Sequence, residues 1–147
     1  MKVLVIDVGG THVKVLASGR KEEPRKAPSG GRLTPVRMVE KVRELARGWE
    51  YGAVSLGYPG LVGPDGPAAE PENLGPGWVG FDFAAALGKP ARVINDAAMQ
   101  ALGSYRGGRM LFLGLGTSLG STLVSRKVLV PLELGSLPFR DAALADW

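Results

Sequence analysis

A chain of 147 residues, 45% hydrophobic and 22% charged, is long enough for one domain or two small lobes and has the composition of a soluble globular protein. It contains no cysteine and a single histidine, His12, which excludes disulfides and thiolate metal sites and argues against a histidine-based metal site or a Ser-His-Asp triad. The net charge of +4 comes from scattered lysines and arginines without interleaved aromatic residues, so we expect no nucleic-acid surface.

The first apolar run, residues 2–6, is too short for a secretory signal peptide, which needs a longer apolar region and a small-residue cleavage site. No other segment approaches the roughly 20 apolar residues of a membrane span. We therefore expect a cytoplasmic protein that does not engage a membrane.

The first third of the chain predicts a hairpin, a short strand and a helix. Residues 2–7 contain the apolar, largely β-branched run Val-Leu-Val-Ile, as in a buried strand, and residues 12–18 alternate as a second strand, antiparallel to the first. Residues 19–33 are polar and predict a loop with a short third strand. Thr34 and Pro35 then favour a helix start.

That helix is expected to run to about Arg47, with Gly48 ending it. Residues 53–57 predict another buried strand. The following loop, residues 58–77, is rich in glycine and proline, and a loop of this length inside a compact domain usually serves function. Asp82 can cap a short helix that ends at Leu87.

Residues 91–94 predict a strand, and Asn95 or Asp96 then caps a helix to about Tyr105. Three further strands form a meander over residues 110–115, 121–125 and 128–131. Residues 106–109 are expected to be the hinge between an N-terminal lobe, 1–106, and a second lobe, 107–147. Three strands leave apolar sheet faces uncovered, so the tail 132–147, a second subunit or further chain would have to cover them.

Two glycine-rich turns lie about a hundred residues apart, each between two apolar runs. The first is residues 7–14, Asp-Val-Gly-Gly-Thr-His-Val-Lys, and the second is residues 114–120, Gly-Leu-Gly-Thr-Ser-Leu-Gly. Glycines in such turns let backbone N–H groups approach an anion closely, and hydroxyls and a lysine help to hold it. Together the turns predict a phosphate held between two lobes.

Several motifs resemble those of ROK-family sugar kinases in order and spacing. They are Asp-x-Gly-Gly-Thr-x-x-Lys at 7–14, Gly-Tyr-Pro-Gly at 57–60, Asn-Leu-Gly-Pro-Gly-Trp at 73–78, Ile-Asn-Asp-Ala-Ala at 94–98, Leu-Gly-Thr-Ser-Leu-Gly-Ser at 115–121 and Glu-Leu-Gly at 133–135. Within the family the pattern is most similar to polyphosphate glucokinases, and the similarity covers about residues 2–139. It implies an α/β, actin-like ATPase (ribonuclease H-like) fold with a complete N-terminal lobe and an incomplete second lobe.

The resemblance assigns phosphate binding to both glycine turns. The implied residues are Asp7, Gly9, Gly10, Thr11 and Lys14 in the first turn, and Gly116, Thr117, Ser118 and Gly120 in the second. Asp7 would also orient Mg²⁺ or its water, since magnesium takes few carboxylates and keeps waters. Taken alone, the first turn is equally compatible with a hairpin that binds no ligand, and we expect His12 to be a surface residue.

The resemblance also implies sugar-binding residues. Asp96 would be the general base that takes the proton from a sugar hydroxyl, and Asn95 would hold neighbouring hydroxyls. Asn73 and Glu133 would contact the sugar through amide and carboxylate groups. The residue types alone also fit a helix N-cap at Asn95 or Asp96, a turn residue at Asn73 and an exposed charge at Glu133.

The chain departs from the family pattern at three points. Ser136 stands where the family has a sugar-contacting histidine, and the cysteine-rich zinc element is absent, as in the polyphosphate-using branch. The sequence ends shortly after Phe139, so we expect the helices and loop that would hold the adenosine of ATP to be missing.

The expected function is a kinase that transfers phosphate from ATP or polyphosphate to a glucose-like hexose, with Mg²⁺ and without zinc, as a homodimer. The alternative is a degenerate, non-catalytic relative that binds sugar or phosphate, or acts as a partner subunit.

Overall fold

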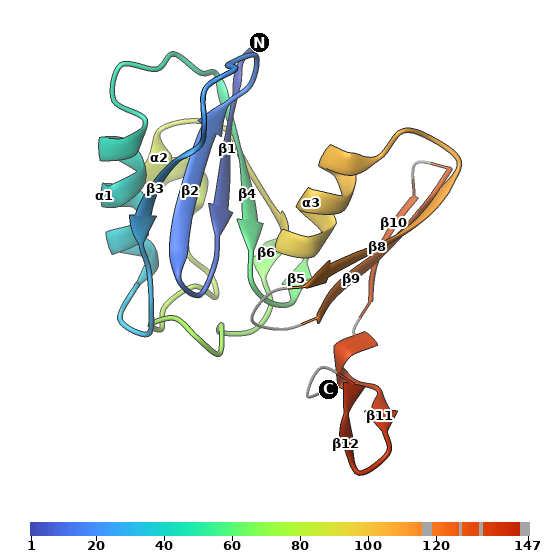
Figure 1. The fold of residues 1–147 in the computed structure, drawn as a ribbon. Helices are drawn as coiled ribbons and strands as arrows, with labels where there is room; N and C mark the ends of the chain where they lie inside the picture. The colour runs from blue at the N-terminus through green and yellow to red at the C-terminus, as the bar shows by residue number, and fades with distance from the viewer. Residues whose placement is uncertain (116–118, 127, 133, 145–147) are drawn as a thin grey trace. The chain divides into compact units, whose positions relative to one another are not determined.

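The computed structural model describes residues 1–115, 119–126, 128–132 and 134–144. It divides into two compact units between Ile94 and Asn95 (Figure 1). Among the described residues, no helix has both the length and the apolar character needed to cross a membrane.

The first unit is built on a five-stranded mixed sheet in the order β3-β2-β1-β4-β7. Strands β1 (Val3–Val8) and β2 (His12–Ala17) are antiparallel, as predicted, and β1 pairs in parallel with β4 (Ala53–Tyr58). The short strand β3 (Arg25–Pro28) lies at one edge, beside β2, and β7 (Ala91–Asn95) lies at the other.

Alternation along β1 separates two faces of this sheet. Leu4, Ile6 and Val8 are fully buried in the core, whereas Val5 and Asp7 point to the opposite face and are half-buried. The core also takes side chains from helices α1 (Pro35–Leu45) and α2 (Phe83–Leu87), which pack against each other beside the sheet (Figure 1). Asp7 is therefore held by a core strand while its carboxylate stays outside the core.

Local signals set the helix limits of this unit. The Thr34 hydroxyl accepts the N–H of Arg37 at the start of α1, and the carboxylate of Asp82 accepts the N–H of Ala85 at the start of α2. Helix α1 ends at Leu45, slightly before the predicted Arg47. The long loop that was predicted after β4 contains a small hairpin, β5 (Val62–Gly63) with β6 (Gly66–Pro67).

The second unit is a three-stranded antiparallel meander covered on one face by a helix. Its sheet order is β10-β9-β8, with β8 at Arg109–Leu115, β9 at Leu119–Ser125 and β10 at Val128–Leu132. Helix α3 (Asp96–Ser104) packs on β9. A short 3-10 turn (Leu134–Ser136) and a two-stranded pair, β11 (Pro138–Phe139) with β12 (Ala142–Ala143), follow.

The division between the units differs from the lobe boundary expected at residues 106/107. Helix α3 buries Ala97, Ala98 and Ala101, and its contacts are with the strands of the meander. The helix therefore groups with the strands that follow it, and the division moves to its N-terminus.

Candidate active site

The first glycine turn, Gly9–Thr11, joins β1 to β2 and is closed by its own backbone. The N–H of Gly9 donates to the carbonyl of His12 at 2.9 Å, and a Cβ added at Gly9 would lie 3.2 Å from that same oxygen. Neither Gly9 nor Gly10 has a positive φ. Glycine is needed here because the backbone approaches itself closely, and the Gly9 N–H is used by the turn's own hydrogen bond.

Ser29 stabilises this turn through two hydrogen bonds, which the sequence did not predict. Its hydroxyl donates to the carbonyl of Gly9 at 2.6 Å, and its N–H donates to the carbonyl of Thr11 at 2.9 Å. The pairing of β3 with β2 places Ser29 beside the turn, because Pro28 lies opposite His12 and the next residue, Ser29, therefore lies opposite the end of the turn. In the sequence, the only indication of this contact was a serine directly after an edge strand. Because residues 19–33 were predicted as a loop with a short strand, no hydrogen-bond partner could be assigned to Ser29.

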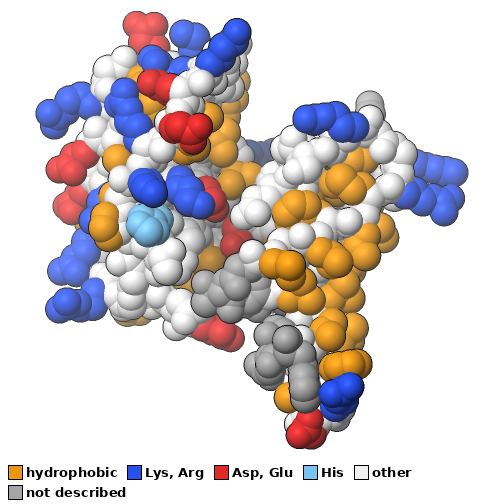
Figure 2. Space-filling view, viewed as in Figure 1, with side chains coloured by type: hydrophobic (Ala, Val, Ile, Leu, Met, Phe, Trp, Pro, Cys, Tyr) orange, Lys and Arg blue, Asp and Glu red, His pale blue; other side chains and the backbone are white. Residues whose placement is uncertain are grey.

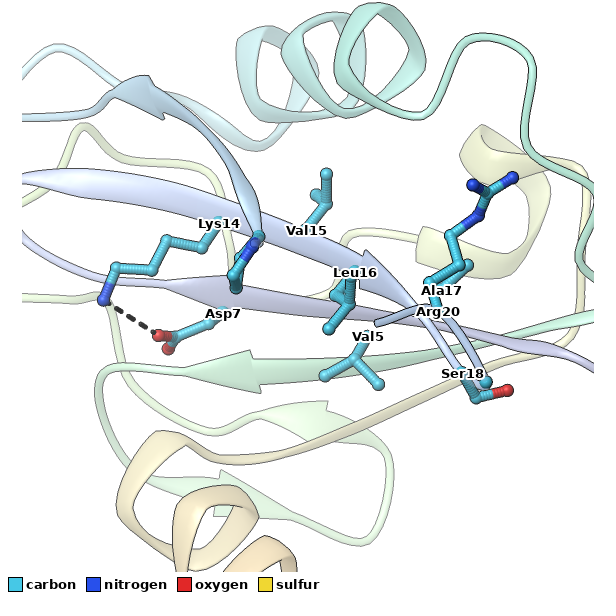
Figure 3. Close-up of a pocket in the computed structure, with 10 residues that line it drawn as sticks. Val5, Asp7, Lys14, Val15, Leu16, Ala17, Ser18 and Arg20 are labelled. Carbon is cyan, nitrogen blue, oxygen red and sulfur yellow. Dashed lines mark ion pairs between the residues drawn. The ribbon is translucent and has the colours of Figure 1, made fainter. Parts of the chain in front are cut away.

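Asp7 and Lys14 lie directly opposite each other on β1 and β2. The Lys14 ammonium is 3.7 Å from the Asp7 carboxylate (Figure 3). The side chains of Lys14 and Asp7 are 51% and 24% exposed, respectively. They line one end of a mainly apolar hollow of about 280 Å³ on the sheet, together with Val5 and Leu16. A loose pair of this kind leaves both charges accessible beside the glycine turn.

The loop of the predicted sugar contact reaches the same turn. A Cβ added at Gly10 would lie 3.5 Å from the Cβ of Asn73, although more than sixty residues separate them in the sequence. Asn73 itself is exposed. Next to it, the N–H of Gly75 donates to the carbonyl of Leu33 at 3.1 Å and ties the loop to the start of α1.

A second unforeseen residue, Glu70, organises the same loop. Its carboxylate accepts the backbone N–H groups of Gly77, Trp78 and Val79. These hydrogen bonds, led by that of Trp78, hold the pKa of the Glu70 carboxyl below its ordinary value. Nearby, burial raises the pKa of the Tyr58 phenol to about 12, with a smaller contribution from the negative charge of Glu70.

Asn95 and Asp96 form the N-terminus of α3. The Asn95 side chain is the N-cap and accepts the N–H of Ala98 at 3.1 Å, while Asp96 opens the first turn and accepts the N–H of Ala97 at 2.8 Å. Of the two residues predicted as possible N-caps, Asn95 is the one that caps the helix. Both side chains are half-buried.

The second glycine turn is described only at its edges. Gly116, Thr117 and Ser118, like the predicted sugar contact Glu133, lie outside the described residues. Gly120 is described, and a Cβ added there would lie 3.0 Å from the Cβ of Ala97. Gly120 thus permits the close approach of α3 to β9.

Within the described ranges, no group of three or more acidic or histidine side chains could enclose a metal ion. Asp7 offers a single carboxylate. One carboxylate suits a magnesium ion that is held mainly by phosphate oxygens and water.

The chain is similar to several known proteins in sequence and in fold. The bifunctional enzyme NanE/NanK of Brucella melitensis biotype 1 is 31% identical over 135 residues, which cover 83% of the chain. The polyphosphate/ATP-glucomannokinase of Arthrobacter sp. strain KM superposes with a TM-score of 0.81 over 99% of the chain at 27% identity. The ROK hexokinase of Thermus thermophilus superposes with a TM-score of 0.69 over 93% of the chain at 26% identity.

The chain resembles the ROK-family sugar kinases in sequence and in fold. The α/β fold with a mixed sheet is that of these sugar kinases, as predicted. No protein-family model matches the chain. The chain spans 26% of the NanE/NanK protein, 67% of the glucomannokinase and 53% of the ROK hexokinase.

Proposed function

We propose that this protein is a sugar kinase that transfers a phosphoryl group from ATP or polyphosphate to a hydroxyl of a glucose-like hexose. The observation that carries the proposal is the meeting of Asn73 with the Gly10 turn, beside the Asp7–Lys14 pair. The proposal assigns sugar contact to the amide of Asn73, and phosphate binding to the turn backbone and the neighbouring Lys14 charge. The similarity to a glucomannokinase that uses polyphosphate and ATP supports this choice of substrates.

In the proposed reaction the sugar hydroxyl oxygen bonds to the terminal phosphorus as the bond from phosphorus to the donor's bridging oxygen breaks. The hydroxyl proton passes to the carboxylate of Asp96, and Asn95, Asn73 and Glu133 orient the sugar. Positioning and charge stabilisation carry most of phosphoryl-transfer catalysis, so the residues around the phosphate matter as much as the base.

The donor phosphates are proposed to lie against the N–H groups of Gly10 and Thr11, with Lys14 supplying positive charge. The second turn contributes Gly116, Thr117, Ser118 and the neighbouring Gly120. Asp7 would hold Mg²⁺ through its water ligands, and the ion would supply neutralisation of the phosphate charge.

The substitution Asp96→Asn tests the general base. It keeps the size and position of the side chain but removes the proton acceptor, so we expect the turnover number to fall by a factor of about 10² to 10⁴. Sugar phosphorylation is measured with ATP and with polyphosphate as donors, and Asp65→Asn, an exposed residue of the β5–β6 hairpin, is the matched control. Full turnover by the Asp96 variant would contradict the assignment. Sugar binding by the wild type without turnover on any hexose would favour the non-catalytic alternative.

A further inference from the structure

Glu70 closes the loop that carries Asn73. Its Oε2 atom accepts the N–H groups of Gly77 at 2.9 Å and Trp78 at 3.1 Å, and its Oε1 atom accepts the N–H of Val79 at 3.1 Å. One side chain therefore joins the two ends of residues 70–79, and Asn73 lies within the closed segment.

Both ends of this segment are also anchored in the core. The Tyr58 hydroxyl donates to the carbonyl of Ala69 at 2.8 Å, directly before Glu70. At the other end, the Trp78 ring is fully buried against Tyr58 and Phe83, and its indole N–H donates to the carbonyl of Gly75 at 2.7 Å. The anchors place the ends of the loop, and Glu70 connects them.

Three donors on one carboxylate require the charged form. A carboxylate offers two acceptor oxygens and forms charge-assisted bonds, whereas the amide of glutamine offers one acceptor oxygen and turns an NH₂ group toward the remaining N–H. Replacement by glutamine should therefore lose at least one of the three hydrogen bonds that close the loop, while leaving the size of the side chain unchanged.

We propose that Glu70 is a positioning residue for sugar binding, which holds Asn73 against the Gly10 turn before the sugar arrives. This inference rests on the proposed sugar-kinase function. A loop that is only partly in its binding conformation lowers the apparent affinity by the fraction that is competent. Glu70 acts on the loop and not on the phosphorus, so its loss raises the KM for sugar and leaves the turnover number nearly unchanged.

The test compares Glu70→Gln with Asp65→Asn, a matched carboxylate-to-amide change in the same long connection, in the full chain. We expect a KM for hexose about tenfold higher in the Glu70 variant, with kcat within about twofold of wild type, and no change in the control. Amide hydrogen exchange measured by NMR should accelerate at residues 77–79 and stay unchanged in α1.

An unchanged KM, or a fall in kcat at constant KM, would overturn the proposal. If Glu70→Gln does not fold, Glu70→Asp decides the question, because it keeps the charge but shortens the reach, and a raised KM with preserved kcat is again required. The exchange measurement does not depend on activity. A wild type that neither binds nor phosphorylates hexoses therefore refutes the proposed function, whereas unchanged exchange at 77–79 refutes the role of Glu70 in the loop.

Discussion

Tyr58 shows how one buried hydroxyl links the core to the candidate site. Its side chain is fully buried at the end of β4, and its hydroxyl donates to the carbonyl of Ala69, next to the loop that carries Asn73. The sequence placed Tyr58 in a motif shared with sugar kinases, but the motif did not show what the hydroxyl contacts. The partner lies eleven residues away, across an irregular loop whose path no periodic pattern encodes.

Because the Tyr58 phenol is buried, we expect the free energy of unfolding to fall at alkaline pH. Its pKa is about 12 in the fold against 10.0 for the free side chain, so the fold favours the neutral form. The contribution is fully present below pH 10 and is lost as the pH rises toward 12, by about 2–3 kcal/mol. Urea unfolding between pH 8 and 12 should show this loss in the wild type and not in Tyr58→Phe, which costs about 1 kcal/mol at neutral pH through its missing hydrogen bond. The change Tyr51→Phe is the control, and parallel pH profiles for wild type and Tyr58→Phe would contradict the prediction.

At the scale of elements, α3 and β9 meet at two small residues. A Cβ added at Gly120 would come within 3.0 Å of the Cβ of Ala97, one residue after Asp96. Real Cβ atoms rarely approach so closely, so a larger residue would push the helix away from the sheet. The glycine that was predicted to bind phosphate thus also sets the position of the helix that carries the proposed base.

The substitution Gly120→Ala should therefore destabilise the second unit by about 1–3 kcal/mol and displace the start of α3. Adding Ala97→Gly restores the space and should recover part of the loss, even though the glycine alone costs about 1 kcal/mol inside a helix. Thermal unfolding of the two single variants and the double variant measures the coupling. Strictly additive effects would show that the two positions do not compete for space.

At the scale of the whole molecule, one face of the meander in the second unit is apolar and exposed. Leu123 lies opposite Leu111 on β8 and opposite Val130 on β10, and the three side chains are 38%, 53% and 40% exposed. Leu113 and Leu115 extend the same face along β8, and Figure 2 shows hydrophobic side chains gathered over this unit. Helix α3 covers the other face, where Val124 is buried.

We propose that this apolar face mediates homodimerisation, since burial against the same face of a second copy would remove its exposed leucines and valine from water. The double substitution Leu111→Lys/Leu113→Lys should shift the mass in sedimentation velocity toward that of a monomer, because the added charges would have to be buried in the contact. Val36→Lys/Leu61→Lys, two exposed residues of the first unit, adds the same charge elsewhere and should leave the dimer intact. A wild type that stays monomeric at micromolar concentration would contradict the proposal.

Local rules acting within a few residues determined much of this protein from its sequence alone. Alternation specified β1 and β2, the Thr34-Pro35 and Asp82 starts specified α1 and α2, and the motif spacing indicated the resemblance to sugar kinases. Only the tertiary structure brought Asn73 to Gly10, Ser29 to the first turn and Glu70 to the backbone of residues 77–79. These contacts join segments through irregular loops, where no periodic side-chain pattern indicates the partner. The grouping of α3 with the strands after it was likewise decided by packing, because the helix contacts β8, β9 and β10 and approaches β9 closely at Gly120.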